Sequence, residues 1–418
     1  MNSRTSLLFL CWGCPWPAHM GVHLRSIGLL EQISKSFDVT LLILSPTPIS
    51  QEQHEWLSQF AQEIIWLPLR SQTVADRLSV VWRIVCHRLP FHAASLRYSL
   101  EHRKDIETHI MNFPGLVFTS LGHWGSLVKD DRSSAWILNQ CDADIEFWKV
   151  YARQSNGIAK KIIAFFNYRL SLNLFHKVYP NVRQIISVCE EDRQLTAQLS
   201  GDTPVDVIEN GIDCRQYVPN RTHLRANHQL LFTGTSAPRN MIALEQIVQD
   251  ILPLIMAEIP TVELVVAGNF SEAAQSQFKK YPNIRFTGRV PDIKPYFDQS
   301  DVYVAYFNET HGSKLKIAEA MSMAIPIVST SAGVRGFPLE HGQSVFMADH
   351  PEEFATHVIT LLKNKELGRQ IGNQAREIAL ESIDWHVLGL RLNKILQSHA
   401  IKSGFYPEHK GPKHFIAL

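Results

Sequence analysis

The chain has 418 residues, which is too long for one ordinary hydrophobic core and suits two domains of about 200 residues each. Its 41 basic residues nearly balance its 40 acidic ones, so bulk charge does not indicate a nucleic-acid-binding protein. The N-terminus lacks the pattern of a signal peptide, and no stretch reaches the roughly 18 apolar residues of a membrane span. These features predict a cytoplasmic protein.

The first part of the chain alternates strand and helix patterns. Residues 7–11 predict a strand, 23–34 a helix and 39–44 a fully apolar strand, as in a doubly wound α/β sheet. Ligands bind such sheets beyond the carboxyl ends of the strands, which is where Gly21 and Arg25 follow the first strand. A plain Pro/Gly loop is the alternative for residues 13–21.

Two segments combine basic and aromatic residues, 76–100 and 159–179. Helices with basic and aromatic faces can lie on an anionic membrane, but helices that pack against a sheet can have the same composition. Both interpretations stay open for these segments. Of the six cysteines, only Cys11 and Cys14 have metal or redox spacing, and no second pair completes a zinc site. We therefore expect buried thiols.

The middle of the chain contributes a histidine at a strand end. Residues 116–120 predict a short strand and His123 follows it, so this side chain is expected at the ligand-binding edge of the first domain. A lone histidine is more often structural. Another strand at 136–138 leads to Asn139 and then to Asp142 and Asp144.

The domain plan follows from the remaining patterns. The first domain is expected to span residues 1–213, ending at the turn pair Asn210-Gly211, and 214–228 to be a linker. Residues 229–384 would form the second domain, which again alternates strand and helix. A final helix at 385–400 precedes a tail, 401–418, that has no periodicity.

The most informative stretch is residues 311–330, HGSKLKIAEAMSMAIPIVST, which predicts a loop, a helix and a buried strand. Ser313 is a plausible N-cap, and Gly312, Lys316 and Glu319 share one side of the helix. A helix N-terminus attracts a diphosphate, and Glu319 would lie about 10 Å along the axis, near the hydroxyls of a ribose. An exposed Lys/Glu pair on a surface helix is the alternative.

Residues 230–268, 284–307 and 311–337 together resemble the C-terminal half of retaining GT-B glycosyltransferases, and most closely the family-four enzymes that build bacterial exopolysaccharides. The resemblance covers residues 7–395 in order. It implies a GT-B fold, an α/β architecture of two Rossmann-like domains that face a deep cleft. It also implies transfer of a sugar, with retention of configuration, from a nucleotide sugar to a glycan or lipid-linked acceptor in cell-surface polysaccharide biosynthesis.

The resemblance assigns roles to individual residues. His123 would lie against the transferred sugar and Lys316 would meet the leaving diphosphate, so these two are the predicted catalytic residues. Glu319 would hold the ribose, and the nucleotide base would lie near residues 288–290. The predicted donor site comprises Gly21, Arg25, Arg239, Asn240, Gly288, Arg289, Val290, His311, Gly312, Ser313, Lys314, Leu315 and Glu319.

The resembled enzymes imply neither a cofactor nor a metal, because amide groups and cations neutralise the diphosphate. No general base is named, since the leaving phosphate can take the acceptor proton. Asp142-Ala-Asp144 matches the metal-holding Asp-x-Asp of the other large glycosyltransferase fold, but that fold would leave the second half of the chain unexplained. Peripheral attachment to the inner face of the plasma membrane is expected if the acceptor is lipid-linked, and no nucleic-acid partner is expected.

The chain departs from the family pattern at several positions. His311 replaces a frequent glutamate, Asn139 an aspartate and Ala324 a glycine, while Arg239 is a weak substitute for an Arg and Lys usually found after Gly234. Tyr306-Phe-Asn stands where the subgroup has Pro-Leu-Arg. A catalytically degenerate protein that binds glycan or another subunit is therefore the alternative function. A nucleotide-sugar epimerase of the same fold lacks positive support.

Overall fold

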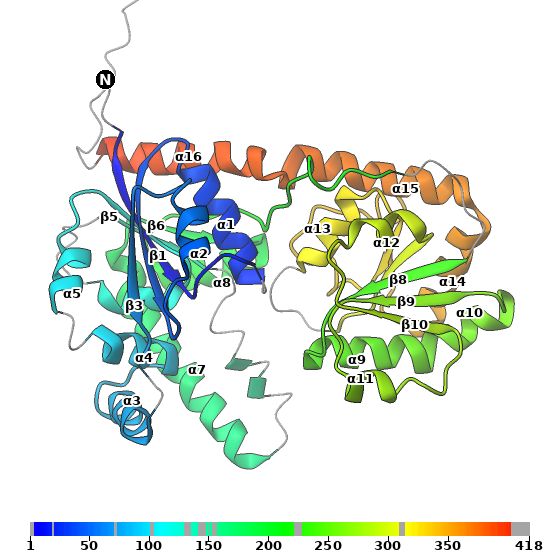
Figure 1. Cartoon of the computed structure of the whole chain (residues 1–418), viewed down its shortest axis with the longest axis horizontal. Helices are drawn as coiled ribbons and strands as arrows, with labels where there is room; N and C mark the ends of the chain where they lie inside the picture. The colour runs from blue at the N-terminus through cyan, green and yellow to red at the C-terminus, as the bar shows by residue number, and fades with distance from the viewer. Residues whose placement is uncertain are drawn as a thin grey trace, which may run out of the picture. The chain divides into compact units, whose positions relative to one another are not determined.

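The computed structural model describes residues 4–18, 21–70, 73–100, 104–128, 135–140, 148–149, 151–152, 157–220, 228–308 and 314–402. Contacts divide the chain into two units, Met1–Ile208 with the stretch from Gly389, and Glu209–Leu388 (Figure 1). Each unit has a parallel sheet of its own with helices packed on it, as the alternating pattern predicts. Cys214, the first residue of the expected linker, belongs to the core of the second unit. Its backbone N–H donates a hydrogen bond to Asp384 Oδ2 at 3.0 Å.

The first unit contains a seven-stranded sheet in the order β3-β2-β1-β4-β5-β6-β7. Its strands are β1 Ser6–Trp12, β2 Asp38–Ser45, β3 Glu63–Pro68, β4 Leu116–Thr119, β5 Ala135–Asn139, β6 Gln184–Ser187 and β7 Val205–Val207. Its helices are α1 Gly21–Ile33, α2 Gln51–Leu57, α3 Val74–Cys86, α4 Phe91–Leu100, α5 Lys104–Met111, η1 Gly122–Leu127, α7 Ile158–Val178, η2 Tyr179–Asn181 and α8 Glu190–Ser200. The central strands are apolar on both faces because helices cover both faces of a parallel sheet.

The second unit contains a six-stranded sheet in the order β10-β9-β8-β11-β12-β13. Its strands are β8 Gln229–Thr233, β9 Glu263–Ala267, β10 Ile284–Gly288, β11 Val302–Ala305, β12 Ile327–Ser329 and β13 Phe346–Met347. Its helices are α9 Pro238–Gln246, η3 Ile247–Ile251, α10 Leu252–Glu258, α11 Glu272–Ser276, α12 Lys294–Gln299, α13 Leu315–Ser322, α14 Pro351–Lys363, α15 Lys365–Ile378 and η4 Ala379–Ile383, and α16 Trp385–Lys402 continues into the first unit.

One continuous helical stretch, residues 238–258, is long and apolar enough to cross a membrane by length and composition, which differs from the expectation that no segment would be. Nearly half of it, 44% of its most apolar window, is buried inside the protein. Leu244, Val248, Ile251 and Ile255 on this stretch belong to the core of the second unit. It is therefore a core helix whose length and apolar composition also fit a membrane span.

Candidate functional site

The carboxyl ends of three neighbouring strands in the second unit are joined through bare backbone. Gly234 follows β8 and its amide donates to Ala267 O at 3.0 Å, while the Gly268 amide donates to Gly288 O at 3.3 Å. Gly268 has a φ of +125°, and a Cβ there would lie only 2.0 Å from Gly234 O. At Gly288, whose φ is +69°, a Cβ would meet nothing within 4 Å. The strand ends thus form a surface of backbone groups with open space beside Gly288.

Lys316 brings a cation to this edge from α13. Its Nζ donates to Thr233 O at 2.8 Å and to Asn240 Oδ1 at 2.9 Å, so it connects the end of β8, the start of α9 and α13. The ammonium also lies 4.7 Å from the ring centre of Phe307 and 5.3 Å from that of Phe232, as in cation–π contacts. Both hydrogen-bond acceptors are neutral.

The protonation of Lys316 is displaced from its ordinary value. Burial lowers the pKa of Lys316 to about 7, and the charges of Arg239 and Lys314 lower it further, whereas Glu319 opposes them. The charged and neutral forms of Lys316 are therefore close in free energy at neutral pH. An anion bound beside Nζ would favour the charged form.

Glu319 lies one turn along α13 from Lys316. Tyr217 donates a hydrogen bond from its hydroxyl to Glu319 Oε1 at 3.3 Å. Burial raises the pKa of Glu319 to about 7, although Tyr217 and Lys316 both act to lower it. Tyr217 is itself held in place, because its carbonyl accepts from Ser322 Oγ at 2.9 Å and from Arg376 Nη1 at 2.8 Å.

The beginning of α13 differs from the expectation. Lys314 occupies the N-cap position in place of Ser313, and no side chain caps the helix there. The Lys314 side chain is buried and donates from Nζ to Ala332 O at 3.1 Å, which fixes it away from the helix end. Leu315 is the first helical residue and is half-buried. His311, Gly312 and Ser313 lie outside the described residues.

The other predicted donor-site residues of this unit differ in exposure. Asn240 is buried and also donates from Nδ2 to Thr235 O at 3.1 Å, whereas Arg239 beside it on α9 is exposed. Arg289 is exposed and Val290 half-buried after β10. Asn240 is thus joined directly to Lys316, while the two arginines are available to a ligand.

In the first unit, Gly21 is the exposed first residue of α1 and Arg25 lies one turn later. Arg25 is only 1% exposed, and its guanidinium donates to Asn139 Oδ1 from Nε at 3.2 Å and from Nη2 at 2.7 Å. Asn139 in turn donates from Nδ2 to Ser120 O at 3.2 Å. Arg25 therefore ties α1 to the ends of β4 and β5.

His123 lies in η1, just past β4, and is 3% exposed. Its Nε2 is buried and has no hydrogen-bond partner within the described part of the chain. The ring packs edge-on to Trp12 with centres 4.4 Å apart and stacks on His92 at 5.5 Å. Burial, and to a lesser degree the charge of His92, lower the pKa of His123 well below its usual value, so this imidazole is neutral.

Three residues at these places were not found from the sequence. Tyr217 falls in the expected linker and nothing in its neighbourhood marks it, because its partner is far along the chain. His92 follows Phe91 in the basic and aromatic segment 76–100, and Trp12 ends the first strand. The aromatic character that His92 and Trp12 share is too frequent in the sequence to single them out.

Metal ligands are not clustered in the described ranges. No group of three or more His, Cys, Asp or Glu side chains is placed there to hold an ion, while Asp142 and Asp144 fall outside those ranges. Cys11 and Cys14 are not joined by a disulfide, and Cys14 Sγ donates to Trp16 O at 3.1 Å. Metal independence stays a prediction.

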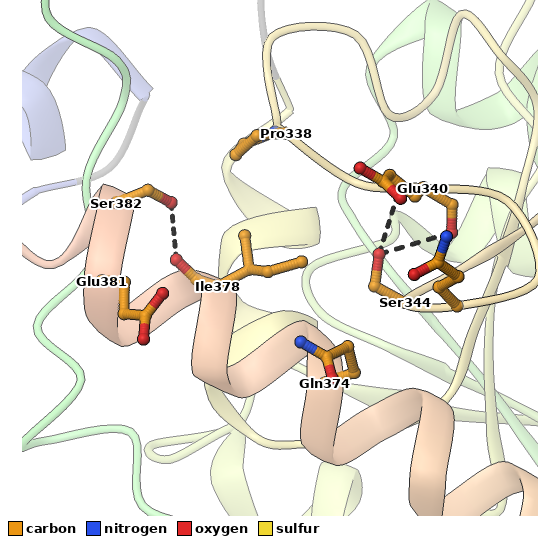
Figure 2. A pocket seen from close by; sticks show the side chains of 8 residues that line it. Pro338, Glu340, Ser344, Gln374, Ile378, Glu381 and Ser382 are labelled. Carbon is orange, nitrogen blue, oxygen red and sulfur yellow. Dashed lines mark hydrogen bonds between the residues drawn. The ribbon is translucent and has the colours of Figure 1, made fainter.

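A hollow of about 350 Å³ in the second unit does not contain the candidate residues (Figure 2). Its lining residues are Pro338, Glu340, Gln343, Ser344, Gln374, Ile378, Glu381 and Ser382. The two serine hydroxyls are hydrogen-bonded to backbone groups: Ser344 Oγ accepts from Glu340 N at 2.8 Å, and Ser382 Oγ donates to Ile378 O. We do not assign a ligand to it.

Residues 227–364 match the family model described as Glycosyl transferases group 1. The chain is 21% identical over 392 residues to an uncharacterized 44.6 kDa protein in the cps region of Klebsiella pneumoniae, covering 89% of this chain and 94% of that protein.

Solved structures resemble nearly the whole chain. HepE from Anabaena, crystallised with UDP and glucose, is 14% identical with a TM-score of 0.64, and the match covers 94% of this chain and all 100% of that one. Sucrose-phosphate synthase from Thermosynechococcus elongatus is 14% identical with a TM-score of 0.69, over 96% and 100% of the two chains. These matches confirm the predicted two-domain GT-B fold.

Proposed function

We propose that this chain, which by family and by fold is a group 1 glycosyltransferase, moves a sugar from a nucleotide sugar to a glycan or lipid-linked acceptor with retention of configuration. The observation that carries the proposal is the pairing of Lys316 and Glu319 on one side of α13, beside the bare strand ends of the second sheet. The Klebsiella cps-region relative supports a product in cell-surface polysaccharide biosynthesis. UDP-bound HepE supports a uridine nucleotide as the first donor to test.

The diphosphate would bind at Lys316. An ammonium has three N–H donors, and two of them are used on Thr233 O and Asn240 Oδ1, which leaves the third for a phosphate oxygen. Both of its hydrogen-bond acceptors are neutral, so a phosphate bound at Nζ would add to the single counter-charge that Glu319 provides. The amide groups at the start of α13 and the exposed Arg239 would meet the remaining charge, without a metal ion.

The ribose would bind at Glu319. The carboxylate accepts hydrogen bonds only, and Tyr217 uses just one of its acceptor positions. The 2′ and 3′ hydroxyls of a ribose would donate to the rest, as charge-assisted hydrogen bonds. The base would then lie by the open backbone at Gly288, with Arg289 and Val290 following it.

In the transfer step the bond between the anomeric carbon and the diphosphate oxygen breaks, and a bond from the same carbon to the acceptor oxygen forms on the same face. The proton of the acceptor hydroxyl goes to the leaving phosphate, so the step balances without a protein nucleophile. Lys316 stabilises the negative charge that develops on the diphosphate. His123, being neutral, accepts or donates a hydrogen bond to a hydroxyl of the transferred sugar.

The acceptor and the place of work are part of the proposal. In α7, Phe165 and Phe166 are 57% and 59% exposed and Lys160 and Lys161 are exposed beside them, which supports peripheral attachment to an anionic membrane surface. The acceptor would then be lipid-linked, and the enzyme would work on the inner face of the plasma membrane.

The test is thermal unfolding of the full chain with nucleoside diphosphates, UDP first. UDP at 100 times its dissociation constant should add about 2.7 kcal/mol of stability. Lys316→Met should abolish that shift, while Lys279→Met, which removes an exposed cation of the same unit, should keep it. If no nucleoside diphosphate raises the melting temperature, the proposal is wrong.

Turnover separates the enzyme from the binding protein. With a responding nucleotide, its sugar conjugates should release the diphosphate in the presence of acceptor, and the anomeric proton of the product should show the donor's configuration by NMR. Binding without turnover across a panel of donors would favour the degenerate, glycan-binding alternative.

A further inference from the structure

Asn240, the third residue of α9, has both ends of its side-chain amide occupied. Its Oδ1 accepts a hydrogen bond from Lys316 Nζ at 2.9 Å, and its Nδ2 donates to Thr235 O at 3.1 Å. The side chain is only 6% exposed, and a Cβ on Gly234 would lie 3.0 Å from Asn240 Cγ and Nδ2. Asn240 therefore connects the loop after β8 to the cation of α13 and has little surface left for a ligand.

The chemistry of these two contacts requires an uncharged amide. An ammonium group only donates hydrogen bonds, and a backbone carbonyl only accepts them. The side chain between Lys316 and Thr235 O must therefore offer an acceptor on one side and a donor on the other. Asparagine has both and carries no charge, whereas an ionised aspartate of the same shape has acceptors alone and adds a negative charge.

The other groups that contact the Lys316 ammonium are also neutral. Thr233 O accepts its second hydrogen bond at 2.8 Å, and the centres of the Phe232 and Phe307 rings lie 5.3 and 4.7 Å from Nζ. Both rings are buried in the core of the second unit. Lys316 is thus held in place by hydrogen bonds and ring contacts that leave its charge unpaired at contact distance.

The charged groups near Lys316 add up to a positive site. Arg239 and Lys314 have the same sign as Lys316, and in the described part of the chain Glu319 is the carboxylate that opposes them. Glu319 is only partly ionised at neutral pH, since burial raises its pKa to about 7. An aspartate at position 240 would place a second negative charge at hydrogen-bond distance from Nζ, and the amide avoids this.

We infer that Asn240 is a positioning residue that holds Lys316 at the end of β8 without neutralising it, and that this neutral support sets the preference of the site for a nucleoside diphosphate over the nucleoside. Asn240 acts on the nucleotide through Lys316 and makes no contact with it. The inference rests on the proposed transfer function, and it names the residue that keeps the charge of Lys316 available to the phosphates.

The test compares UDP with uridine, because uridine lacks the diphosphate but keeps the ribose and the base. At pH 6 Lys316 is mostly charged with either residue at position 240, so calorimetry with UDP and ligand-observed NMR with uridine are run on the full chain at that pH. Asn240→Asp should weaken UDP binding about ten-fold and leave uridine binding within two-fold, since the added charge repels only the phosphates. Equal weakening of both ligands would indicate direct contact or general damage and would overturn the inference.

Asn283→Asp is the matched control. Asn283 also donates from Nδ2 to a backbone carbonyl, Val262 O at 2.8 Å, but it precedes β10 at the amino edge of the same sheet. The substitution removes the same kind of hydrogen bond and adds the same charge away from Lys316. It should keep the ratio of the UDP and uridine dissociation constants within two-fold of the wild type. A ratio changed as much as in Asn240→Asp would overturn the inference.

Asn240→Ala is the second variant if Asn240→Asp does not fold. It removes both hydrogen bonds of the amide and adds no charge, so Lys316 loses its support from α9. UDP binding should then weaken about three- to ten-fold while uridine binding is unchanged, as expected for one lost hydrogen bond to a charged group. Wild-type affinity for UDP in folded Asn240→Ala would show that Lys316 needs no such support.

A measurement without ligand separates this inference from the donor chemistry. Asn240→Asp should reduce the rise in stability between pH 7 and 10.5, because a neighbouring carboxylate brings the pKa of Lys316 back toward its ordinary value of 10.5. If this rise shrinks while UDP does not bind the wild type, the donor chemistry fails and the positioning of Lys316 by Asn240 stands. If UDP binds the wild type while Asn240→Asp changes neither the pH profile nor the UDP affinity, the donor chemistry stands and the inference fails.

Discussion

Lys316 and Glu319 have pKa values displaced by burial in opposite directions, which gives the ligand-free protein a definite pH dependence. Glu319 titrates near 7 in the folded protein, above its ordinary value of 4.5, so the folded state holds an extra proton between these pH values. Its contribution to stability is present at low pH and is lost as pH rises through 7. Lys316 titrates near 7, below its ordinary 10.5, so the unfolded state holds the extra proton and stability rises over that window.

The check is thermal unfolding without ligand as a function of pH. Glu319→Gln should remove the fall in stability between pH 4.5 and 7, and Lys316→Met should remove the rise between pH 7 and 10.5. Each variant should keep the change in stability that the other residue causes. Lys316→Met should also be as stable as the wild type or more so at pH 6, because it removes a poorly compensated buried charge. Parallel profiles for all three proteins would show that neither group titrates abnormally.

Glu319 and Tyr217 should differ in their effect on nucleotide affinity. Glu319→Gln keeps the shape of the side chain but removes a charge-assisted bond to the ribose, which should cost about 1.5–3 kcal/mol of binding free energy. Tyr217→Phe only frees the carboxylate to move and should cost about 0.5–1.5 kcal/mol. Calorimetric titration with UDP measures both. Wild-type affinity for the Gln variant would remove Glu319 from the site.

Replacing Ala324 by glycine should raise the free energy of unfolding. It follows α13 with a φ of +52°, a left-handed conformation that costs a residue with a Cβ about 1–2 kcal/mol. Ala324→Gly should remove that strain and, after the loss of chain entropy, stabilise by about 0.5–1 kcal/mol. The same substitution at Ala273, exposed in α11, should destabilise by a similar amount. Denaturant unfolding of both variants gives the two signs.

For single residues, the sequence predicts relations between neighbours along the chain and misses contacts between residues that are far apart in it. Lys316 and Glu319 could be placed on one side of a helix because their spacing is helical. Ala324 could be marked as a departure from a family glycine, and its positive φ gives the physical reason for that glycine. The contact of Tyr217 with Glu319 spans 102 positions, and no local pattern encodes it.

Among the elements, α7 combines the two alternatives that the sequence left open. Phe175 is 1% exposed and belongs to the core, whereas Phe165 and Phe166 near the start are more than half exposed. Phe175→Ala should therefore destabilise by about 3–5 kcal/mol, and Phe166→Ala should stay close to the wild type. The basic and aromatic composition is the same along the helix, so only the packing separates the two ends.

The exposed end of α7 should respond to charge. Replacing Lys160 and Lys161 by glutamate should release the protein from vesicles that contain anionic lipid, since each basic residue near such a surface contributes about 1 kcal/mol. Binding of the wild type should also fall as salt rises. The melting temperature of the variant should hardly change, because both side chains are exposed. Binding that ignores salt and charge would indicate a protein that does not attach through this helix.

The same limit applies to α3 and to residues 238–258. The basic and aromatic composition of residues 76–100 does not say which side chains face the core and which the solvent, and on α3 the apolar side chains of Leu78, Val81 and Trp82 face the solvent. For residues 238–258 the length and apolar content match a membrane span, and the structure places the helix in the core. Sequence patterns define the faces of an element, and tertiary packing decides which way they point.

For the whole molecule, the mode of charge neutralisation predicts how the enzyme responds to chelation. If Lys316 and the start of α13 neutralise the diphosphate, turnover should be largely intact in EDTA, because no metal ion shares that task. Donor turnover measured with and without chelator is the test, with Asp144→Asn as the matched variant. If turnover strictly requires Mg²⁺ or Mn²⁺ and Asp144→Asn abolishes that metal-dependent turnover, Asp142-Ala-Asp144 binds a metal and the prediction is wrong.

The division into units also orders events during synthesis. The chain leaves the first unit at Ile208 and returns to it at Gly389, where Gly389 packs so closely on Gln32 that a Cβ would meet Gln32 Oε1 at 2.5 Å. The stretch from Gly389 is made after the whole of the second unit, so the unit whose synthesis begins first is the second to be finished. Domains generally fold as units as they emerge from the ribosome. The second unit can therefore be complete while the first unit still lacks the helical residues that follow Gly389.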